Sequence, residues 1–162
     1  MGLDHHIILE DIKKENIDRA FKVYAWLYKE DEEEYEFIKW LHKEILFRLK
    51  EAEELLSEKW YLNKSITVWF KHNEPDALKE YMFDLLSTIM LFEDLNSIII
   101  FKFNDGYEEK MYYFIKGKYF DENGNVYKVN KKKLLRNIIN YKKSVYKEKL
   151  ERLEKLSKKL EK

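Results

Sequence analysis

The amino-acid sequence predicts an α+β fold, because three kinds of pattern follow one another along the chain. Residues 16–56 repeat apolar side chains every three or four positions, as helices do. Residues 66–129 hold short β-branched and aromatic runs between turn residues, and residues 131–162 return to helical spacing. We expect a single domain, 1–162, with a helical hairpin (1–62), a sheet with one crossover helix (63–130) and a C-terminal helix (131–162).

Two helices make up the expected hairpin. Asn16 is the predicted N-cap of the first, whose apolar positions run from Ile17 to Tyr28. The second runs from Tyr35 to Leu56 with the most regular period in the chain. Its apolar face is widened by Phe37, Trp40, Phe47 and Trp60. A face this wide favours burial against the first helix and a further layer over an isolated coiled coil.

Four strands form the expected sheet, in the order β-α-β-β-β. They cover residues 66–70, 98–103, 111–120 and 126–129. Turn residues at 104–106 and 123–124 separate the last three into an antiparallel meander, and Gly117 is a predicted bulge in the middle strand.

The helix between the first two strands is expected to begin at Pro75, after the capping residue Asn73, and to end near Asn96. It makes a right-handed crossover if the two strands are parallel. The sheet is therefore expected to be mixed and four-stranded.

The last helix is long, amphipathic and basic. At about 1.5 Å per residue, residues 131–162 reach about 48 Å if the helix is unbroken. Its apolar positions lie on one side of the helix, and they are Leu134, Leu135, Ile138, Val145, Tyr146, Leu153, Leu156 and Leu160. Lys142 and Lys149 interrupt this side, so we expect the helix to pack along the domain first and then to project or dimerise at its end.

Charge is segregated along the chain although the formal net charge is zero. Residues 123–147 hold eight basic and no acidic side chains, whereas residues 31–36 are mostly acidic. The predicted nucleic-acid-binding residues are Lys131, Lys132, Lys133, Arg136, Lys142, Lys143 and Lys147. Four of them, Lys132, Arg136, Lys143 and Lys147, share a sector about 60° wide on a helix. Beyond them, acid-first i,i+4 pairs such as Glu148 with Arg152 balance the charge.

Three partners can neutralise the basic residues. The acidic segment 31–36 can lie across the fold and match them internally. A phosphate backbone can fill the same role, because a row of Lys and Arg is the electrostatic footprint of nucleic-acid binding. An acidic protein or an anionic membrane surface is the third. The sequence leaves these alternatives open.

Aromatic side chains are frequent in the meander. Strand alternation places Tyr112 and Phe114 on one face and Met111, Tyr113 and Ile115 on the other. At least one face therefore carries rings, which either pair across strands in the core or, if exposed, stack on bases.

Catalytic and metal-binding motifs are not found in the sequence. The four histidines, His5, His6, His42 and His72, lack the i,i+3 and i,i+4 spacing of helical metal sites, so we predict no metal and no cofactor. Glycine-rich phosphate loops and nucleophile elbows are also absent from the sequence. An enzyme is the third alternative, and a deep pocket holding His42 or His72 beside a carboxylate would favour it.

Composition limits the remaining classes. The chain has no cysteine, and Met1–Glu10 has no positive region and only a short apolar run, so we expect a cytoplasmic protein without a signal peptide or membrane span. Glutamine is absent while Lys, Glu, Ile and Tyr are abundant, a bias similar to that of heat-adapted proteins.

Function is predicted at the level of a class. We expect a noncatalytic binding or regulatory module whose partner is nucleic acid, bound through the basic helix. The alternative is a protein–protein interaction or assembly subunit that forms a homodimer through its long helices, either residues 35–56 or residues 150–160.

Overall fold

The computed structural model describes residues 2–59 and 64–161, with side chains described for residues 2–55 and 64–161. The elements in chain order are β1 (Leu3–Glu10), α1 (Lys14–Leu27), α2 (Glu32–Lys59), β2 (Ser65–His72), α3 (Pro75–Leu91), β3 (Ile98–Asn104), β4 (Glu109–Ile115), β5 (Lys118–Asp121), β6 (Val126–Lys128) and α4 (Lys131–Leu160). The α+β class is confirmed. The side chain of Leu56, together with Trp60 and Lys162, lies outside the described residues.

One antiparallel sheet contains the strands in the order β2-β1-β3-β4-β5-β6. The expectation of a mixed, four-stranded sheet was wrong, because β1 lies between β2 and β3 and is antiparallel to both. The strands β2 and β3 therefore run parallel but are not neighbours, and α3 connects them across β1.

The strand β1 is the main element that the sequence analysis missed. His5, Ile7 and Leu9 alternate into the core, where each is at most 1% exposed. The strand was not predicted because histidine is often exposed, so the two adjacent histidines did not indicate an alternation of buried and exposed positions. Here the imidazole of His5 stacks between Phe70 and Phe103, with ring centroids 5.4 Å from each.

Gly117 forms a hairpin turn and not the predicted bulge. It has a φ of +83°, and the chain reverses between the end of β4 at Ile115 and the start of β5 at Lys118. A two-residue hairpin needs such a left-handed position, which glycine adopts without strain.

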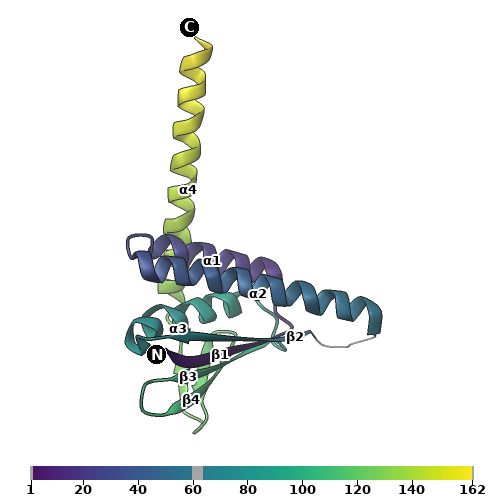
Figure 1. Ribbon diagram of the computed structural model, residues 1–162. Coiled ribbons are helices and arrows are strands. Elements are labelled where there is room, and N and C mark those ends of the chain that lie inside the picture. Colours follow the sequence, from purple (N-terminus) through teal and green to yellow (C-terminus); the bar gives the residue numbers. More distant parts are fainter. Residues whose placement is uncertain (1, 60–63, 162) are drawn as a thin grey trace.

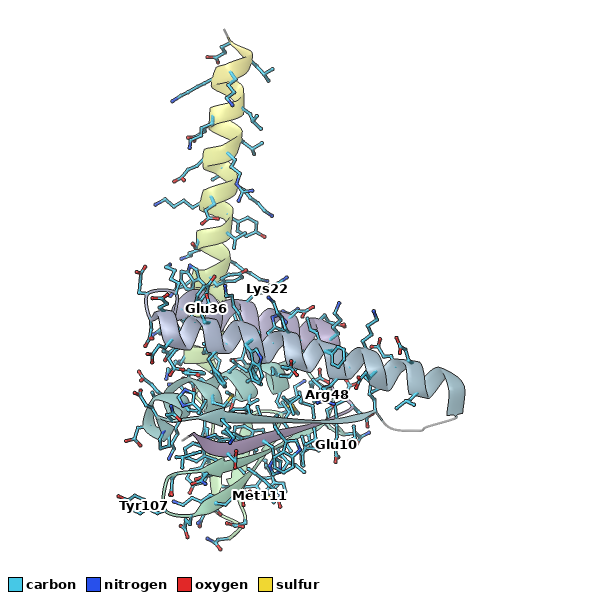
Figure 2. The ribbon with its side chains drawn as sticks, in the orientation of Figure 1. Glu10, Lys22, Glu36, Arg48, Tyr107 and Met111 are labelled. Atoms are coloured by element: carbon cyan, nitrogen blue, oxygen red, sulfur yellow. The ribbon has the colours of Figure 1, made fainter. Side chains whose placement is uncertain are left out.

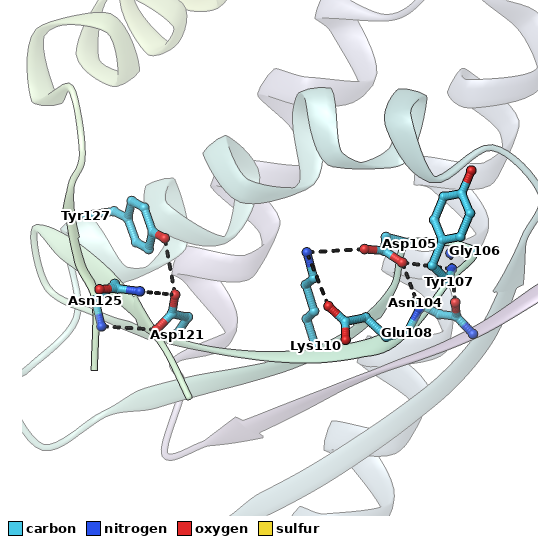
Figure 3. A network of polar contacts seen from close by, with 9 residues as sticks. All are labelled: Asn104, Asp105, Gly106, Tyr107, Glu108, Lys110, Asp121, Asn125 and Tyr127. Carbon is cyan, nitrogen blue, oxygen red and sulfur yellow. Dashed lines mark hydrogen bonds and ion pairs between the residues drawn. The ribbon is translucent and has the colours of Figure 1, made fainter. Parts of the chain in front are cut away.

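The other two hairpin turns are held by carboxylates (Figure 3). Asp105 Oδ1 accepts hydrogen bonds from the backbone N–H groups of Tyr107 at 2.8 Å and Glu108 at 2.9 Å. Asp121 Oδ1 accepts from the backbone N–H groups of Asn123 and Asn125, each at 3.0 Å. These two turns lie where the sequence predicts them, but the meander has four strands, β3 to β6, and not three.

Helix termini differ from the expectation at two places. The N-cap of α1 is Lys13, not Asn16, which is buried and donates from Nδ2 to the Glu93 carboxylate and to the Phe92 carbonyl oxygen. The helix α3 begins at Pro75 as predicted, with Glu74 as N-cap, but it ends at Leu91 rather than near Asn96.

The helices cover one face of the sheet (Figure 1). The helix α3 packs on β3 and β4, α2 packs on β2, and α1 contacts α2, α3 and α4. The core lies between these helices and the sheet, where Phe83 of α3 contacts the rings of Phe101 and Phe114. The helix α4 starts beside this core and projects far beyond the layer of α1 and α2.

Candidate nucleic-acid interface

The first three turns of α4 are anchored to the domain. The side chain of Asn130 caps the helix by accepting a hydrogen bond from the Lys133 backbone N–H at 3.1 Å. Leu134 and Ile138 are 1% and 5% exposed, and α4 contacts both α1 and α3. The side chain of Asn137 donates to the Tyr24 hydroxyl at 3.4 Å. The proximal half of α4, residues 131–147, therefore has a fixed orientation.

Four basic side chains point away from this anchor. At about 100° per residue, the centre of the sector that holds Lys132, Arg136, Lys143 and Lys147 lies about 180° from the side that holds Leu134 and Ile138. We call these four residues the basic sector. All four are exposed. Packing on one side of α4 thus presents the basic sector to solvent on the other.

Lys133 is the predicted binding residue that the fold neutralises. Its Nζ lies 2.8 Å from Asp84 Oδ2 on α3. Among the side chains of residues 2–55 and 64–161, no carboxylate pairs with the basic sector or with Lys131 and Lys142, which lie nearer the packed side of the helix. The structure therefore gathers four of the seven predicted residues into one surface and leaves six without an ion pair.

Acidic side chains of the segment 31–36 form hydrogen bonds and ion pairs with residues outside α4. Glu34 accepts hydrogen bonds from His72 Nε2 at 2.9 Å and from the Tyr81 hydroxyl. Glu36 pairs with Lys39 at 3.3 Å, and Asp31 Oδ1 accepts from the Glu34 backbone N–H. Among the described side chains, no ion pair or hydrogen bond joins this segment to α4, so the segment does not neutralise the basic residues.

A cavity of about 380 Å³ lies at the foot of α4, between α1, α2 and α4. We call it the aromatic pocket; its lining includes Trp26, Tyr35, His42, Tyr141, Lys22, Lys29 and Lys39. Figure 2 labels Lys22 on the layer from which α4 projects.

Lysines and rings alternate around this pocket. Lys29 Nζ lies 4.6 Å from the centre of the Trp26 ring, and Lys39 Nζ lies 4.3 Å from the centre of the Tyr35 ring. The Tyr141 ring meets Trp26 edge-on at 5.9 Å. The sequence analysis did not find this pocket. Its signal in the sequence is an aromatic residue three or four positions before a lysine, at Trp26 with Lys29 after the end of α1 and at Tyr35 with Lys39 on α2.

His42 lines the same pocket. Its Nε2 lies 2.7 Å from Asp18 Oδ1, and its ring stacks on Phe21 with centroids 4.9 Å apart. A histidine beside a carboxylate in a cavity is the arrangement named above as favouring an enzyme. The described lining has no serine, threonine or cysteine to act as a nucleophile with this pair.

His72 lies at a second cavity, of about 320 Å³, which Glu34 also lines. Its Nδ1 accepts from the Glu74 backbone N–H at 3.1 Å, so both ring nitrogens already have partners. Burial raises the pKa of Glu34, but the hydrogen bonds from His72 and Tyr81 outweigh this effect and lower it overall. Burial and the Glu34 carboxylate raise the pKa of Tyr81. This network joins α2, β2 and α3 and has a structural role.

The remaining histidines lie apart from these two. His5 Nδ1 accepts from the Asn104 backbone N–H at 3.1 Å, and His6 packs on Trp69 with ring centroids 4.0 Å apart. In the part of the chain that the structure describes, no group of three histidines and acids could hold a metal ion.

Comparisons with protein-family models, with curated proteins and with solved structures give no match to this chain. None of the described helices is long and apolar enough to cross a membrane.

Proposed function

We propose that this protein is a noncatalytic binding module that holds nucleic acid through the basic sector of α4. One observation carries the proposal. Four cationic side chains share one exposed side of an anchored helix, and none of them pairs with a carboxylate of the described residues. Phosphates are the natural partner of such a row, because their binding releases condensed counterions.

The dimensions of the sector suit a phosphate backbone. From Lys132 to Lys147 the helix rises about 22 Å, at 1.5 Å per residue. Along one strand of a duplex this length spans about six phosphates, at about 3.4 Å per phosphate. The Arg136 guanidinium adds a flat donor that can grip a phosphate with two hydrogen bonds.

The aromatic pocket favours a single strand as the ligand. Unstacked bases pack on aromatic rings, and each such contact contributes about 1–3 kcal/mol. Trp26, Tyr35 and Tyr141 supply rings at the foot of α4, and Lys29 and Lys39 supply charge beside two of them. Tyr141 lies about 150° around α4 from the centre of the basic sector, so a strand must cross the helix to bring a base from that sector into the pocket.

Binding to labelled single- and double-stranded DNA and RNA tests the proposal. The basic-sector variant changes Lys132, Arg136, Lys143 and Lys147 to Gln. The control variant changes Lys149, Lys155, Lys158 and Lys159 to Gln, which removes four positive charges from the far end of the same helix. We expect the first variant to lose binding while folded and the second to keep most of it. Equal losses in both would show that net charge, not the sector, binds the ligand.

A second candidate function is assembly through the distal half of α4, residues 148–160. Its Leu150, Leu153, Leu156 and Leu160 are 55–86% exposed. Exposed leucines on a projecting helix favour a protein partner. By contrast, the apolar positions of α2 at Ile38, Leu41, Ile45 and Leu49 are buried in the core and are not available for a dimer. A change of Leu153 to Lys, followed by measurement of solution mass, tests this candidate.

A further inference from the structure

The sheet has a second face that the described helices leave uncovered. The helices all lie on the face that carries Ile7, Val68, Phe101 and Phe114 (Figure 1). Because side chains alternate along a strand, the residues between these point to the opposite side. We call that side the open face. Met111, which lies on it, is labelled on the part of the molecule farthest from the tip of α4 (Figure 2).

One apolar row crosses the whole open face. The strand register pairs, in succession, Thr67 with Ile8, Ile8 with Ile100, Ile100 with Tyr113, Tyr113 with Phe120 and Phe120 with Val126. These six residues, one from each strand, form the cross-strand row. At about 4.8 Å between strands it is about 24 Å long. No charged residue interrupts it.

The neighbouring rows extend the apolar surface. On one side, the register that pairs Ile99 with Phe114 brings Ile98 next to Ile115. On the other side the row runs from Trp69, which is 66% exposed, through His6 and Lys102 to Met111. An antiparallel sheet with one face in water normally alternates apolar residues inward and polar residues outward. Here the cross-strand row, with Ile98, Ile115, Met111 and Trp69 beside it, forms an apolar patch bordered by polar side chains, and such a patch marks an interaction surface. The bordering residues are His6, Lys102, Glu10 and Lys118.

The chemistry of the open face favours a protein over a nucleic acid. Its central row holds Ile8, Ile100 and Val126, and the rings of Tyr113 and Phe120 in that row stack on each other at 5.2 Å with an interplanar angle of 13°. Rings that already stack on each other offer little surface to a base. A row of apolar side chains that crosses all six strands suits the packing of a second sheet, as in sandwich folds.

Charge placement identifies the partner as a second copy of the chain. Glu10 pairs in register with Ile98, and Lys118 pairs with Ile115, so Glu10 and Lys118 lie in one row, on β1 and β5. A two-fold axis parallel to the strands places β3 of one copy over β4 of the other, and β1 over β5. Glu10 of each copy then faces Lys118 of its partner, twice per dimer. Among the described residues, neither side chain has an ion pair within its own chain.

We propose that two copies of this protein associate face to face through their open faces, about a two-fold axis parallel to the strands. The cross-strand rows pack against each other, with Ile100 over the partner's Tyr113 and Ile8 over the partner's Phe120. The opposed Glu10 and Lys118 side chains fix the relative orientation of the two sheets.

The available area is sufficient for a weak dimer. Three rows about 7 Å apart along the strands, each about 24 Å long, cover about 500 Å² of each copy. The total of about 1,000 Å² is at the lower limit for specific interfaces. We therefore expect dissociation in the micromolar range. The helix α4 projects from the opposite side of the molecule, so the dimer leaves the basic sector free, and this inference does not depend on the proposed function (Figure 1).

Sedimentation over a range of protein concentrations tests the proposal. The native chain should move from monomer to dimer, and Ile100→Lys should weaken the dimer at least 100-fold, because it places a charge in the centre of the packed rows. Leu153→Lys, an equal change on α4, should leave the dimer intact. A chain that stays monomeric at high concentration, or a dimer that Leu153→Lys breaks and Ile100→Lys does not, would overturn the proposal.

Charge reversal tests the orientation without placing a charge in the apolar row. Glu10→Lys and Lys118→Glu should each weaken the dimer, and the double variant should restore it. Circular dichroism of each variant shows whether it is folded. A folded double variant that does not recover the dimer would contradict the two-fold arrangement. If Ile100→Lys has the same sedimentation mass as the native chain at every concentration but no longer binds nucleic acid, the open face binds nucleic acid and the dimer proposal is wrong.

Discussion

The acidic start of α2 and the basic proximal half of α4 carry opposite charge, yet the fold treats them differently. Glu34 is buried among partners from two other elements, Asp31 accepts a backbone hydrogen bond, and Glu36 pairs with its neighbour Lys39. On α4, Lys133 is the only predicted binding residue that pairs with a carboxylate of the described side chains. The acids therefore serve the fold, whereas most of the bases remain available to a ligand.

The difference shows that charge segregation along a sequence does not imply pairing in space. The nearest partner of a charged side chain is often on its own helix or on an element packed against it, and distant runs meet only if the topology brings them together. Here the packed side of α4 is Leu134 and Ile138, so the basic sector points away from the domain.

The largest expected loss of stability comes from removing a carboxylate at the acidic start of α2. Glu34→Ala leaves His72 and Tyr81 without their buried partner, and removal of one member of a buried polar network costs about 3–5 kcal/mol. Glu33→Ala, next to it and exposed, should change the free energy of unfolding by less than about 0.5 kcal/mol. Urea denaturation measures both, and a Glu34→Ala loss as small as that of Glu33→Ala would show that the network does not stabilise the fold.

The next largest effect is expected from truncating a residue that anchors α4 to the domain. Ile138→Ala should destabilise the protein by about 2–3 kcal/mol, because Ile138 is 5% exposed and belongs to the core. Leu153→Ala in the distal half, where the side chain is 61% exposed, should have almost no effect on a monomer. The same denaturation experiment checks this pair. A large loss for Leu153→Ala would indicate that a partner covers the distal half in solution.

Acid should reduce the contribution of Glu34. Its pKa is lowered in the folded state, so its carboxylate stabilises the fold above the ordinary value of 4.5, and that stability is lost as the pH falls through the folded-state pKa. Glu34→Gln lacks this titration. The difference in melting temperature between the native chain and Glu34→Gln should therefore be largest near pH 7 and shrink below pH 4.5. A difference that stays constant with pH would contradict the assignment.

The smallest expected effect is the difference in stability between the variants Lys133→Ala and Lys132→Ala. Lys133→Ala removes the ion pair with Asp84, which is partly exposed and so contributes less than about 1 kcal/mol. Lys132→Ala removes an exposed charge without an ion pair among the described residues and should leave stability unchanged. Their effects on binding should be reversed, with the greater loss for Lys132→Ala. Melting curves and binding titrations on the two single variants decide this.

The fold was predictable where the spacing of apolar residues in the sequence matches the helix or strand that forms there. The helices from α1 to α4 and the strands β2, β3 and β6 follow apolar periodicity and turn residues, so their places were found from the sequence. The strands β4 and β5 were expected as one strand, 111–120. The strand β1 was missed because His5 and His6 interrupt the alternation of apolar and polar residues that indicates a strand. Without β1 between them, β2 and β3 were expected to be parallel neighbours, so the sheet was wrongly predicted to be mixed. Gly117 was assigned to a bulge because a glycine between two β runs is compatible with either a bulge or a turn.

The candidate site was predictable only in part. The basic sector depends on helical spacing alone, so the sequence was sufficient to find it. The aromatic pocket needs Trp26, Tyr35 and Tyr141 from three helices, and the Glu34 network needs three elements as well. Such groupings depend on tertiary contacts that no local pattern reports. The open face could not be recognised before the helices were known to cover only one side of the sheet.

The salt dependence of binding to a single-stranded oligonucleotide tests the central claim most directly. For the native chain, the logarithm of the association constant should fall linearly with the logarithm of salt concentration. In the basic-sector variant the slope should be shallower by up to about 3, at about 0.7 per lost phosphate contact on a single strand. The distal control should keep a slope much closer to the native one. An unchanged slope in a folded basic-sector variant, or no native binding at low salt, would contradict the account.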